Sequence, residues 1–545
     1  MKSGGVKKNL INVIIVLMII GVVFLNSYSY MQKKNGFFLD ETCSFLFSNV
    51  YCTSASRILE GIRTSDLSDV VADFDDMRFP VERWETHEEV IERYTTGASG
   101  KFNYLNMYII LSQDVHPPLY YFFLNTFSSF FPNLSIKWTG YLINIFFLLF
   151  TCVLIFKIIL LVLGEDKSLI ACSAALFYGL SFEFVNNATY FRMYAMLAFW
   201  LALLLYMSIS WCLRGYGNES HEIVKHCLVV FMAMLTQYFA AFFVFPIVVL
   251  NVVYMLRRST SPRKYIRNLI ASGVIYIVVW PFSISQVLFS NRGQDVAGNI
   301  GLVGLIYRLK SYLWWLCMSL FAGSKKLIAG VMTLMILWIA VSACKLIRRA
   351  EDGGLKEYEK YFYIAIPAAV YYIVVAALSP WVVDRYQMPV MPMISMLIVL
   401  TLWKTAKLVI KNPHACGAVL IAFSVLCCIH WKKRLEPYYL YNDSARIDYI
   451  SQYSGVNAML VDPEGTSYKS EIEMNYAHPM YFSTMEDNFK VTLNQALSDN
   501  DNLIVYACKT CDPNKIRSGL EAANSLWKKL DYSDDSYDVY YLYSE

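Results

Sequence analysis

The sequence carries little charge for its length. Only 17% of its 545 residues are charged, whereas 57% are hydrophobic and 16% are aromatic. Soluble domains usually contain about 25% charged residues, so the composition argues against a large soluble enzyme. The low charge accompanies repeated apolar runs long enough to cross a bilayer as helices. These runs predict an all-α polytopic membrane bundle.

Other features are also missing. No basic run alternates with aromatic residues, so we expect no nucleic-acid partner. The 13 cysteines contain no pair of Cys pairs spaced as in zinc sites. Most of them stand inside apolar segments, where a thiol is usually a small core residue. No internal repeat or low-complexity segment is present, and the sequence assigns no cofactor.

The basic residues orient the chain. Lys2, Lys7 and Lys8 precede the first apolar segment, residues 10–30, and no small-residue cleavage site ends that segment. Because the cytoplasmic ends of membrane helices carry an excess of Lys and Arg, we expect the N-terminus in the cytoplasm. The first segment is then an uncleaved signal anchor in the cytoplasmic membrane. It delivers the residues after it to the outer face.

Ten later apolar segments bring the predicted total to eleven membrane spans. They cover residues 138–162, 168–184, 190–213, 224–237, 239–256, 266–289, 327–346, 361–378, 386–403 and 416–430. Residues 118–131 are expected to form an interfacial helix, and residues 302–320 an amphipathic helix in an outer loop at 290–325. Counting 302–320 as a twelfth span would reverse every later loop, against the Lys and Arg bias.

Two polar regions interrupt the apolar pattern. Residues 31–115 predict a long outer loop with an acidic middle, which is part of a membrane domain at 1–437. Residues 438–545 predict a small extracytoplasmic α/β domain. Its strands are expected at 458–461, 503–507 and 539–543, with a helical pattern at 514–529.

Two adjacent carboxylates, Asp40 and Glu41, stand where the chain leaves the first span. Carboxylates at a membrane boundary are costly to desolvate, which favours a functional role. The alternative is that Asp40 only caps a helix over residues 41–48. Both interpretations stay open at this point.

Three more polar clusters fall on the outer face of the predicted topology. They are Asp114 with His116, Pro117 and Pro118; Arg192 with Tyr194; and Arg385 with Tyr386. A lone Arg at a helix end usually reaches for the lipid headgroups. Two of them, each beside a Tyr and on the same face as Asp40, favour a site for an anionic lipid, because guanidinium groups bind phosphate through paired hydrogen bonds.

With these motifs the chain resembles the C superfamily of membrane glycosyltransferases (GT-C). The most similar group is the protein mannosyltransferase-like one, glycosyltransferase family 39, with its RgtA/B/C/D-like relatives. The residues that match are the Asp40-Glu41 pair, the run Asp-Val-His-Pro-Pro-Leu-Tyr-Tyr at 114–121, Arg-Met-Tyr-Ala at 192–195, and Arg385-Tyr386 before spaced prolines. The resemblance covers about residues 10–430. Where many relatives have Thr-His-Tyr, this chain has Gln237 between Thr and Tyr.

The resemblance implies a sugar donor carried on a polyprenyl phosphate and used at the outer face. The acceptor is then a hydroxyl on a cell-surface glycan, lipid or protein. A polyprenyl phosphate is a good leaving group, so the acceptor needs a base more than the donor needs an acid. We assign catalysis to Asp40 and Glu41, and donor-phosphate binding to Arg192, Arg385 and His116. Further substrate contacts are expected from Asp114, Tyr194, Gln237 and Tyr386.

Several alternatives remain. Asp73-Phe74-Asp75 matches the carboxylate pattern of some metal-using glycosyltransferases, although a three-residue match is common by chance. Cys508 and Cys511 could pair outside the cell, but the sequence around them lacks the strand-then-helix pattern of a redox site. At the level of function, the rivals are a lipid-linked sugar flippase, a ligase of similar shape, and a non-catalytic assembly protein whose tail binds wall glycan. Residues 290–325 contain no His, which counts against the ligase.

Overall fold

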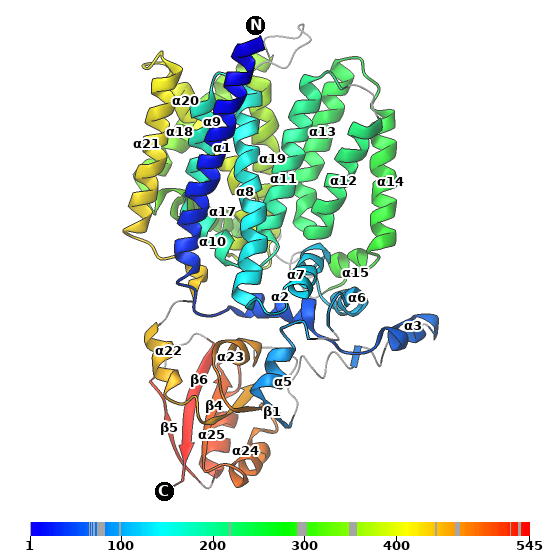
Figure 1. Ribbon diagram of the computed structural model, residues 1–545, viewed down its shortest axis with the longest axis vertical. Helices are drawn as coiled ribbons and strands as arrows, with labels where there is room; N and C mark the ends of the chain where they lie inside the picture. Colours follow the sequence, from blue (N-terminus) through cyan, green and yellow to red (C-terminus); the bar gives the residue numbers. More distant parts are fainter. Residues whose placement is uncertain are drawn as a thin grey trace. The chain divides into compact units, whose positions relative to one another are not determined.

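The computed structural model describes residues 2–64, 66, 68, 71–72, 82–97, 100–216, 220–290, 302–347, 357–441, 444–463, 469–523, 525–531 and 536–544. The chain divides into two compact units, and each is described by itself (Figure 1). Unit 1 comprises Met1–Gln32, Asp114–Tyr120 and Tyr141–Tyr438. Unit 2 comprises Lys33–Gln113, Tyr121–Gly140 and Tyr439–Glu545. One change of unit therefore falls next to the predicted boundary at residue 437.

Unit 1 is a helical bundle. Its elements are α1 (Lys2–Met31), α8 (Ile136–Leu163), α9 (Ser168–Gly179), α10 (Phe182–Thr189), α11 (Tyr194–Leu213), α12 (Ser220–Thr236), η1 (Tyr238–Ala240), α13 (Ala241–Arg257), α14 (Arg263–Val279), α15 (Ser283–Leu288), α17 (Leu302–Phe321), α18 (Lys325–Ile347), α19 (Glu357–Leu378), η2 (Asp384–Val390), α20 (Met391–Ala406) and α21 (Pro413–Lys432). The predicted all-α membrane bundle is confirmed. Figure 1 shows its long helices running in one common direction.

Among the described residues, eight helices are long and apolar enough to cross a membrane, or up to nine if α9 and α10 form one span. Helices also stand at the two remaining predicted positions. However, α12 and α14 have 17 residues each, which is about 26 Å of helix against a hydrocarbon core of about 30 Å. The total of eleven spans therefore stays a prediction.

Two predicted spans are broken. Residues 168–184 were expected as one helix, but α9 and α10 meet at a 55° bend. Ser181 starts α10 by accepting a hydrogen bond from the Phe184 N–H at 3.1 Å. The expected span at 266–289 also ends early, at Val279. The residue before a proline is driven out of the helical region, and Pro281 has this effect on Trp280.

Burial within unit 1 varies strongly between helices. The span Asp384–Ala406 has 83% of its apolar stretch buried, whereas Lys325–Cys344 has 22%. Large apolar side chains stand exposed on the outer helices, with Phe245 at 70% and Val278 at 75%. Such a surface requires an apolar solvent, because water would make it costly. Unit 1 is therefore built as a bundle with lipid-facing sides.

Unit 2 combines the first polar loop with the C-terminal tail. Its elements are α2 (Leu39–Asn49), α3 (Ala55–Thr64), β1 (Trp84–Thr86), α5 (His87–Glu92), α6 (Tyr104–Ser112), most of α7 (Leu119–Phe130) and η3 (Tyr438–Leu440), α22 (Ser444–Ser451), β2 (Asn457–Asp462), α23 (Lys469–Asn475), β3 (Met480–Met485), α24 (Phe489–Ser498), β4 (Asn502–Cys508), α25 (Pro513–Ala522), β5 (Leu526–Lys529) and β6 (Tyr537–Tyr543).

One six-stranded sheet organises unit 2, in the order β1-β3-β2-β4-β6-β5. β2 is parallel to β3 and β4, while β1, β5 and β6 pair antiparallel. The strands predicted at 458–461, 503–507 and 539–543 are present as β2, β4 and β6. The helical pattern at 514–529 is wrong beyond Ala522, because residues 526–529 form β5 against β6. Its four side chains are exposed, so the burial pattern of a core strand is lacking there.

The first polar loop supplies the edge strand of this sheet. β1 pairs antiparallel with β3, with Trp84 opposite Phe482 and Thr86 opposite Met480. The loop and the tail are thus hydrogen-bonded into one unit, although about 400 residues separate the two strands in sequence. This arrangement brings the segment of Asp40 and Glu41 into the same folded unit as the C-terminal sheet.

Candidate active site

Arg192 lies in the short link between α10 and α11. α10 ends at Thr189, Tyr190 leaves the helical conformation, and α11 begins at Tyr194. The link is closed by a hydrogen bond from the Arg192 N–H to the Tyr190 carbonyl at 2.8 Å. Arg192 is only 4% exposed. Its guanidinium is a permanent positive charge, because arginine stays protonated even when buried.

His116 connects Arg192 to Asp114. The Arg192 Nη2 lies 3.1 Å from the His116 Nε2, and the His116 Nδ1 lies 2.6 Å from the Asp114 Oδ2. Arginine can only donate, so the Nε2 atom accepts and the proton of the neutral ring sits on Nδ1, facing the carboxylate. These three predicted site residues therefore form one chain of hydrogen bonds, which fixes the direction of the imidazole.

Arg385 is held beside the same link by a second tyrosine. Its Nη1 donates to the Tyr190 hydroxyl at 3.1 Å, and its guanidinium lies 5.7 Å from the centre of the Tyr386 ring. Asp384 fixes the backbone, because its Oδ1 accepts from the Arg385 N–H at 2.8 Å. The first residues of η2 therefore present a second oriented cation.

An aromatic frame joins the two arginines. Tyr190 stacks on Tyr194 at 6.0 Å with a 9° angle between the rings, and Tyr194 meets Tyr386 edge-on at 6.5 Å. All three rings are buried. Within unit 1, six of the predicted residues thus come together: Asp114, His116, Arg192, Tyr194, Arg385 and Tyr386.

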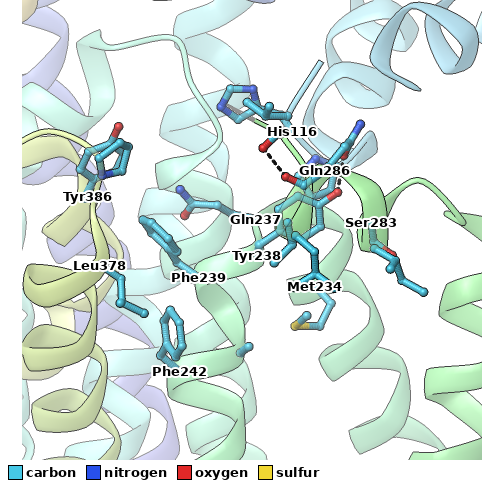
Figure 2. Close-up of a pocket in the computed structure, with 18 of the residues that line it drawn as sticks. His116, Met234, Gln237, Tyr238, Phe239, Phe242, Ser283, Gln286, Leu378 and Tyr386 are labelled. Atoms are coloured by element: carbon cyan, nitrogen blue, oxygen red, sulfur yellow. Dashed lines mark hydrogen bonds between the residues drawn. The ribbon is translucent and has the colours of Figure 1, made fainter. Parts of the chain in front are cut away.

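A cavity of about 580 Å³ opens beside this cluster (Figure 2). His116, Gln237 and Tyr386 line it together with a largely apolar wall that includes Phe239 and Phe242. Gln237 is 7% exposed, and its Oε1 atom accepts no hydrogen bond from the residues that the structure describes. A buried amide oxygen without a donor is costly, so it suits a ligand that carries a hydroxyl or N–H group.

Glu41 lies in unit 2 and is fully buried in an ion pair. Its Oε2 accepts from the Lys34 Nζ at 2.9 Å and from the Phe38 N–H at 2.9 Å. Lys34 also donates to the Tyr439 carbonyl at 2.7 Å. Burial lowers the pKa of Lys34, and Glu41 opposes that shift. Glu41 therefore anchors the start of α2, with its side chain fully buried.

Asp40 is the second residue of α2 and is partly exposed. The helix begins at Leu39, and Phe38 occupies the N-cap position. Asp40 is therefore not the capping residue, which removes the structural alternative considered above. A negative charge in the first turn is favoured by the helix dipole. Asp40 thus stays a candidate base in the position predicted for it.

Two residues at these sites were not selected from the sequence. Tyr190 stands two residues before Arg192 in the sequence, but only its hydrogen bond to Arg385 gives it a role. Lys34 reads in the sequence as a basic residue at the end of a span, where headgroup contact is the usual interpretation. The nearby carboxylate of Glu41 was the only signal for a buried pair.

The metal and cysteine alternatives find little support. Asp73-Phe74-Asp75 lies outside the described residues, and within the described ranges no three His, Cys, Asp or Glu side chains gather as metal ligands would. β4 ends at Cys508 and α25 begins at Pro513, so the strand-then-helix context is present after all. Burial nevertheless raises the pKa of both thiols, Cys508 and Cys511, which disfavours a reactive thiolate.

Comparison with solved structures identifies the fold. ArnT from Cupriavidus metallidurans in the apo state matches at a TM-score of 0.53 with 11% identity, covering 96% of this chain and 97% of that one. The same protein bound to undecaprenyl phosphate matches at 0.48 with 10% identity, covering 96% and 97%. The Archaeoglobus fulgidus oligosaccharyltransferase tethered with an acceptor peptide matches at 0.38 with 10% identity, covering 75% and 63%. No family model and no curated protein matches the sequence. The similarity to ArnT shows the GT-C-like fold.

Proposed function

We propose that this chain, which has a GT-C-like fold, is a membrane glycosyltransferase. It transfers a sugar from a polyprenyl-phosphate donor to a hydroxyl group of a cell-surface glycan, lipid or protein, at the outer face of the cytoplasmic membrane. A hexose such as mannose is the first sugar to test, because the motifs resemble mannosyltransferases. The observation that carries the proposal is the pair of oriented arginines beside an apolar cavity.

The two arginines suit the charge that develops in such a reaction. A sugar-linked polyprenyl phosphate is a phosphodiester with one negative charge, and the released monoester approaches two near neutral pH. The transition state therefore gains charge on the phosphate oxygens. Arg192, oriented by His116, and Arg385, oriented by Tyr190, offer fixed donors for that charge at no further cost in reorganisation.

The cavity suits the isoprenoid chain and the sugar of the donor. Its wall is largely apolar, as an isoprenoid chain requires, while His116, Gln237 and Tyr386 are among the residues that bring polar groups to its lining. The unpartnered Oε1 of Gln237 is a natural acceptor for a sugar hydroxyl. Ligand sites generally combine an apolar wall with a few placed polar groups in this manner.

Asp40 completes the reaction as the general base. Its carboxylate takes the proton of the acceptor hydroxyl while the oxygen attacks the anomeric carbon. The bond from that carbon to the phosphate oxygen breaks, and the electron pair leaves with the polyprenyl phosphate. Partial exposure at the start of α2 suits a base that meets a water-borne acceptor.

The test is sugar transfer by the purified full-length chain in detergent. Undecaprenyl-phosphate donors carrying different hexoses are incubated with a cell-envelope fraction, and release of undecaprenyl phosphate is followed with transfer of labelled sugar. We expect at least one donor to be consumed, and the double variant Arg192→Ala, Arg385→Ala to be inactive. Consumption of none of the donors by a folded wild type would contradict the proposal.

A further inference from the structure

We propose that Asn475 and Ser470, on α23 of the C-terminal domain, are positioning residues for Asp40. This inference rests on the proposed function, because it takes Asp40 as the base. It gives residues 439–545 a role that the motifs leave open. It also distinguishes the chain from an assembly protein with an independent glycan-binding tail.

Asn475 binds the backbone just before Asp40 through two hydrogen bonds. Its Oδ1 accepts from the Phe37 N–H at 2.7 Å, and its Nδ2 donates to the Phe37 carbonyl at 2.8 Å. One amide side chain thus satisfies both backbone groups of a residue, as a neighbouring strand does in an antiparallel hydrogen-bonded pair. Only Asn or Gln carries the donor and acceptor that this requires.

Gly36 shows how closely the two segments approach. A Cβ atom at this position would stand 2.3 Å from the Tyr441 ring and 2.7 Å from the Asn475 Oδ1. The Asn35 N–H also donates to the Leu440 carbonyl at 3.1 Å. The backbone just before Asp40 therefore packs closely against the C-terminal domain. A glycine is needed at position 36, where the contact is tightest.

Ser470 holds the segment on the other side of Asp40. Its hydroxyl lies 2.8 Å from the Thr42 Oγ1. The Thr42 hydroxyl donates its one proton to the Leu39 carbonyl at 2.8 Å, so it accepts from Ser470. Contacts from α23 therefore fall at Phe37 and at Thr42, and Asp40 stands between them. The backbone of Asp40 has little freedom to move relative to α23.

α23 is itself fixed by buried charges. Glu473 is fully buried, accepts from the Tyr94 hydroxyl, and lies 3.5 Å from the Arg93 Nη1. Arg93 also forms an ion pair with Glu85, the middle residue of β1. The Lys469 N–H donates to Asp462 at the end of β2 at 3.1 Å. The sheet thus supports α23, and α23 supports the segment of the candidate base.

A loosened segment should impair chemistry and spare donor binding. A general base must stand within hydrogen-bond reach of its proton, and a displacement of about 1 Å can cost a hundredfold in rate. The proposed phosphate ligands, Arg192 and Arg385, belong to unit 1, whereas α23 belongs to unit 2. Loss of the two hydrogen bonds from Asn475 to Phe37 should therefore lower kcat by about tenfold to a hundredfold and leave the KM for the donor unchanged.

The experiment compares full-length Asn475→Ala, Asn475→Asp and Gly36→Ala with wild type. Asn475→Asp keeps an acceptor for Phe37 but loses the donor, so its loss should be intermediate. Asn457→Ala is the matched control, because Asn457 stands on β2 and bonds to Asn500 at 2.7 Å. Hydrogen exchange of peptides covering residues 35–46 is measured alongside kcat and KM. Hydrogen exchange reports how firmly α23 holds this segment, and it requires no enzymatic activity.

We expect faster exchange at residues 35–46 and a lower kcat in Asn475→Ala and Gly36→Ala, and neither in Asn457→Ala. Unchanged exchange in Asn475→Ala would contradict the claim that Asn475 holds this segment, whatever the activity. Faster exchange with normal kcat would overturn the positioning role while leaving the proposed function intact. A wild type that transfers no sugar would overturn the proposed function, and the inference with it, even if the exchange result stands.

Discussion

At the scale of single residues, two neighbouring carboxylates have different surroundings. Asp40 and Glu41 are both catalytic candidates in the sequence, with Asp40 as the expected base and Glu41 beside it. The fold buries Glu41 against Lys34 and leaves Asp40 partly exposed. A buried charge needs a partner, whereas an exposed one can titrate and exchange protons with a substrate. The difference depends on a lysine that no motif singled out.

The Lys34–Glu41 pair yields the first prediction. Glu41→Gln leaves the Lys34 ammonium buried beside a neutral group, so we expect a loss of about 3–5 kcal/mol in the free energy of unfolding. Adding Lys34→Met removes the unpaired charge and should restore most of that loss. Denaturant unfolding of the purified full chain measures both. A single variant Glu41→Gln as stable as wild type would contradict the buried pair.

The arginine pair yields the second prediction. Arg192→Lys loses the contact to His116, and Arg385→Lys loses the bond to Tyr190 and the planar face over Tyr386. Lys also lacks the paired donors with which a guanidinium binds phosphate. A charge-assisted hydrogen bond to the phosphate is worth about 1.5–3 kcal/mol, so binding of undecaprenyl phosphate should weaken about tenfold or more in each variant.

Arg214→Lys is the matched control for that experiment, because Arg214 is 55% exposed and pairs with Glu222 away from the cluster. The affinity of Arg214→Lys for undecaprenyl phosphate should equal that of wild type. Equal binding by Arg192→Lys, Arg385→Lys and the control would refute a phosphate site formed by these arginines. Fluorescence or calorimetric titration in detergent provides the measurement.

At the scale of elements, apolar periodicity located the long helices well. It failed where a break has a local cause inside an apolar run, as at Trp280-Pro281 and at Ser181. It also failed for β1, whose three residues have no strand pattern of their own. β1 exists because β3 offers it an edge, and β3 lies about 400 residues further along. Such non-local pairing cannot be read from a single segment.

His478 yields a prediction for the C-terminal sheet. Its ring is 2% exposed, with Nδ1 at 2.9 Å from the Val456 carbonyl and Nε2 at 2.8 Å from the Tyr506 hydroxyl. Burial lowers its pKa from 6.5 to about 4. The unfolded chain therefore takes up the proton first as the pH falls. The stability due to neutral His478 is complete above pH 6.5 and is lost between pH 6.5 and 4, by about 3 kcal/mol.

Hydrogen exchange of β2 and β4, corrected for intrinsic rates, follows this loss in the full chain. Asp462 acts in the opposite direction, because burial raises its pKa to about 7 and its ionisation destabilises the fold as the pH rises. The difference between wild type and His478→Gln isolates the histidine. We expect that difference in protection to shrink from pH 7 to pH 5. A constant difference would contradict a buried neutral ring.

At the scale of the whole molecule, the orientation in the membrane remains a prediction from charge. The Lys and Arg bias places residues 404–411 inside and the C-terminal domain outside. Cysteines introduced at Val409 and Val491, which are 85% and 72% exposed, test both faces in a background without native cysteines. Val491→Cys should react with an impermeant reagent in intact cells, and Val409→Cys only after permeabilisation. The reverse pattern would overturn the eleven-span scheme.

The composition and motifs also predicted the class of fold for the whole chain, and the similarity to ArnT confirms it. What they missed is the union of the first polar loop with the tail in one unit. No motif links residues 31–115 to residues 438–545, so the sequence predicts two separate regions. The link consists of the pairing of β1 with β3 and of side-chain contacts such as Asn475 to Phe37, which only the folded chain displays.

The most direct test of the account is sugar transfer by Asp40→Asn. Phe38 holds the N-cap position, so the substitution should leave the unfolding free energy close to that of wild type. Binding of undecaprenyl phosphate should also be unchanged, since the arginines are intact. Turnover from the donor that wild type uses should fall by about a hundredfold to ten-thousandfold, the usual worth of a general base. Near-normal transfer by a folded Asp40→Asn chain would contradict the mechanism.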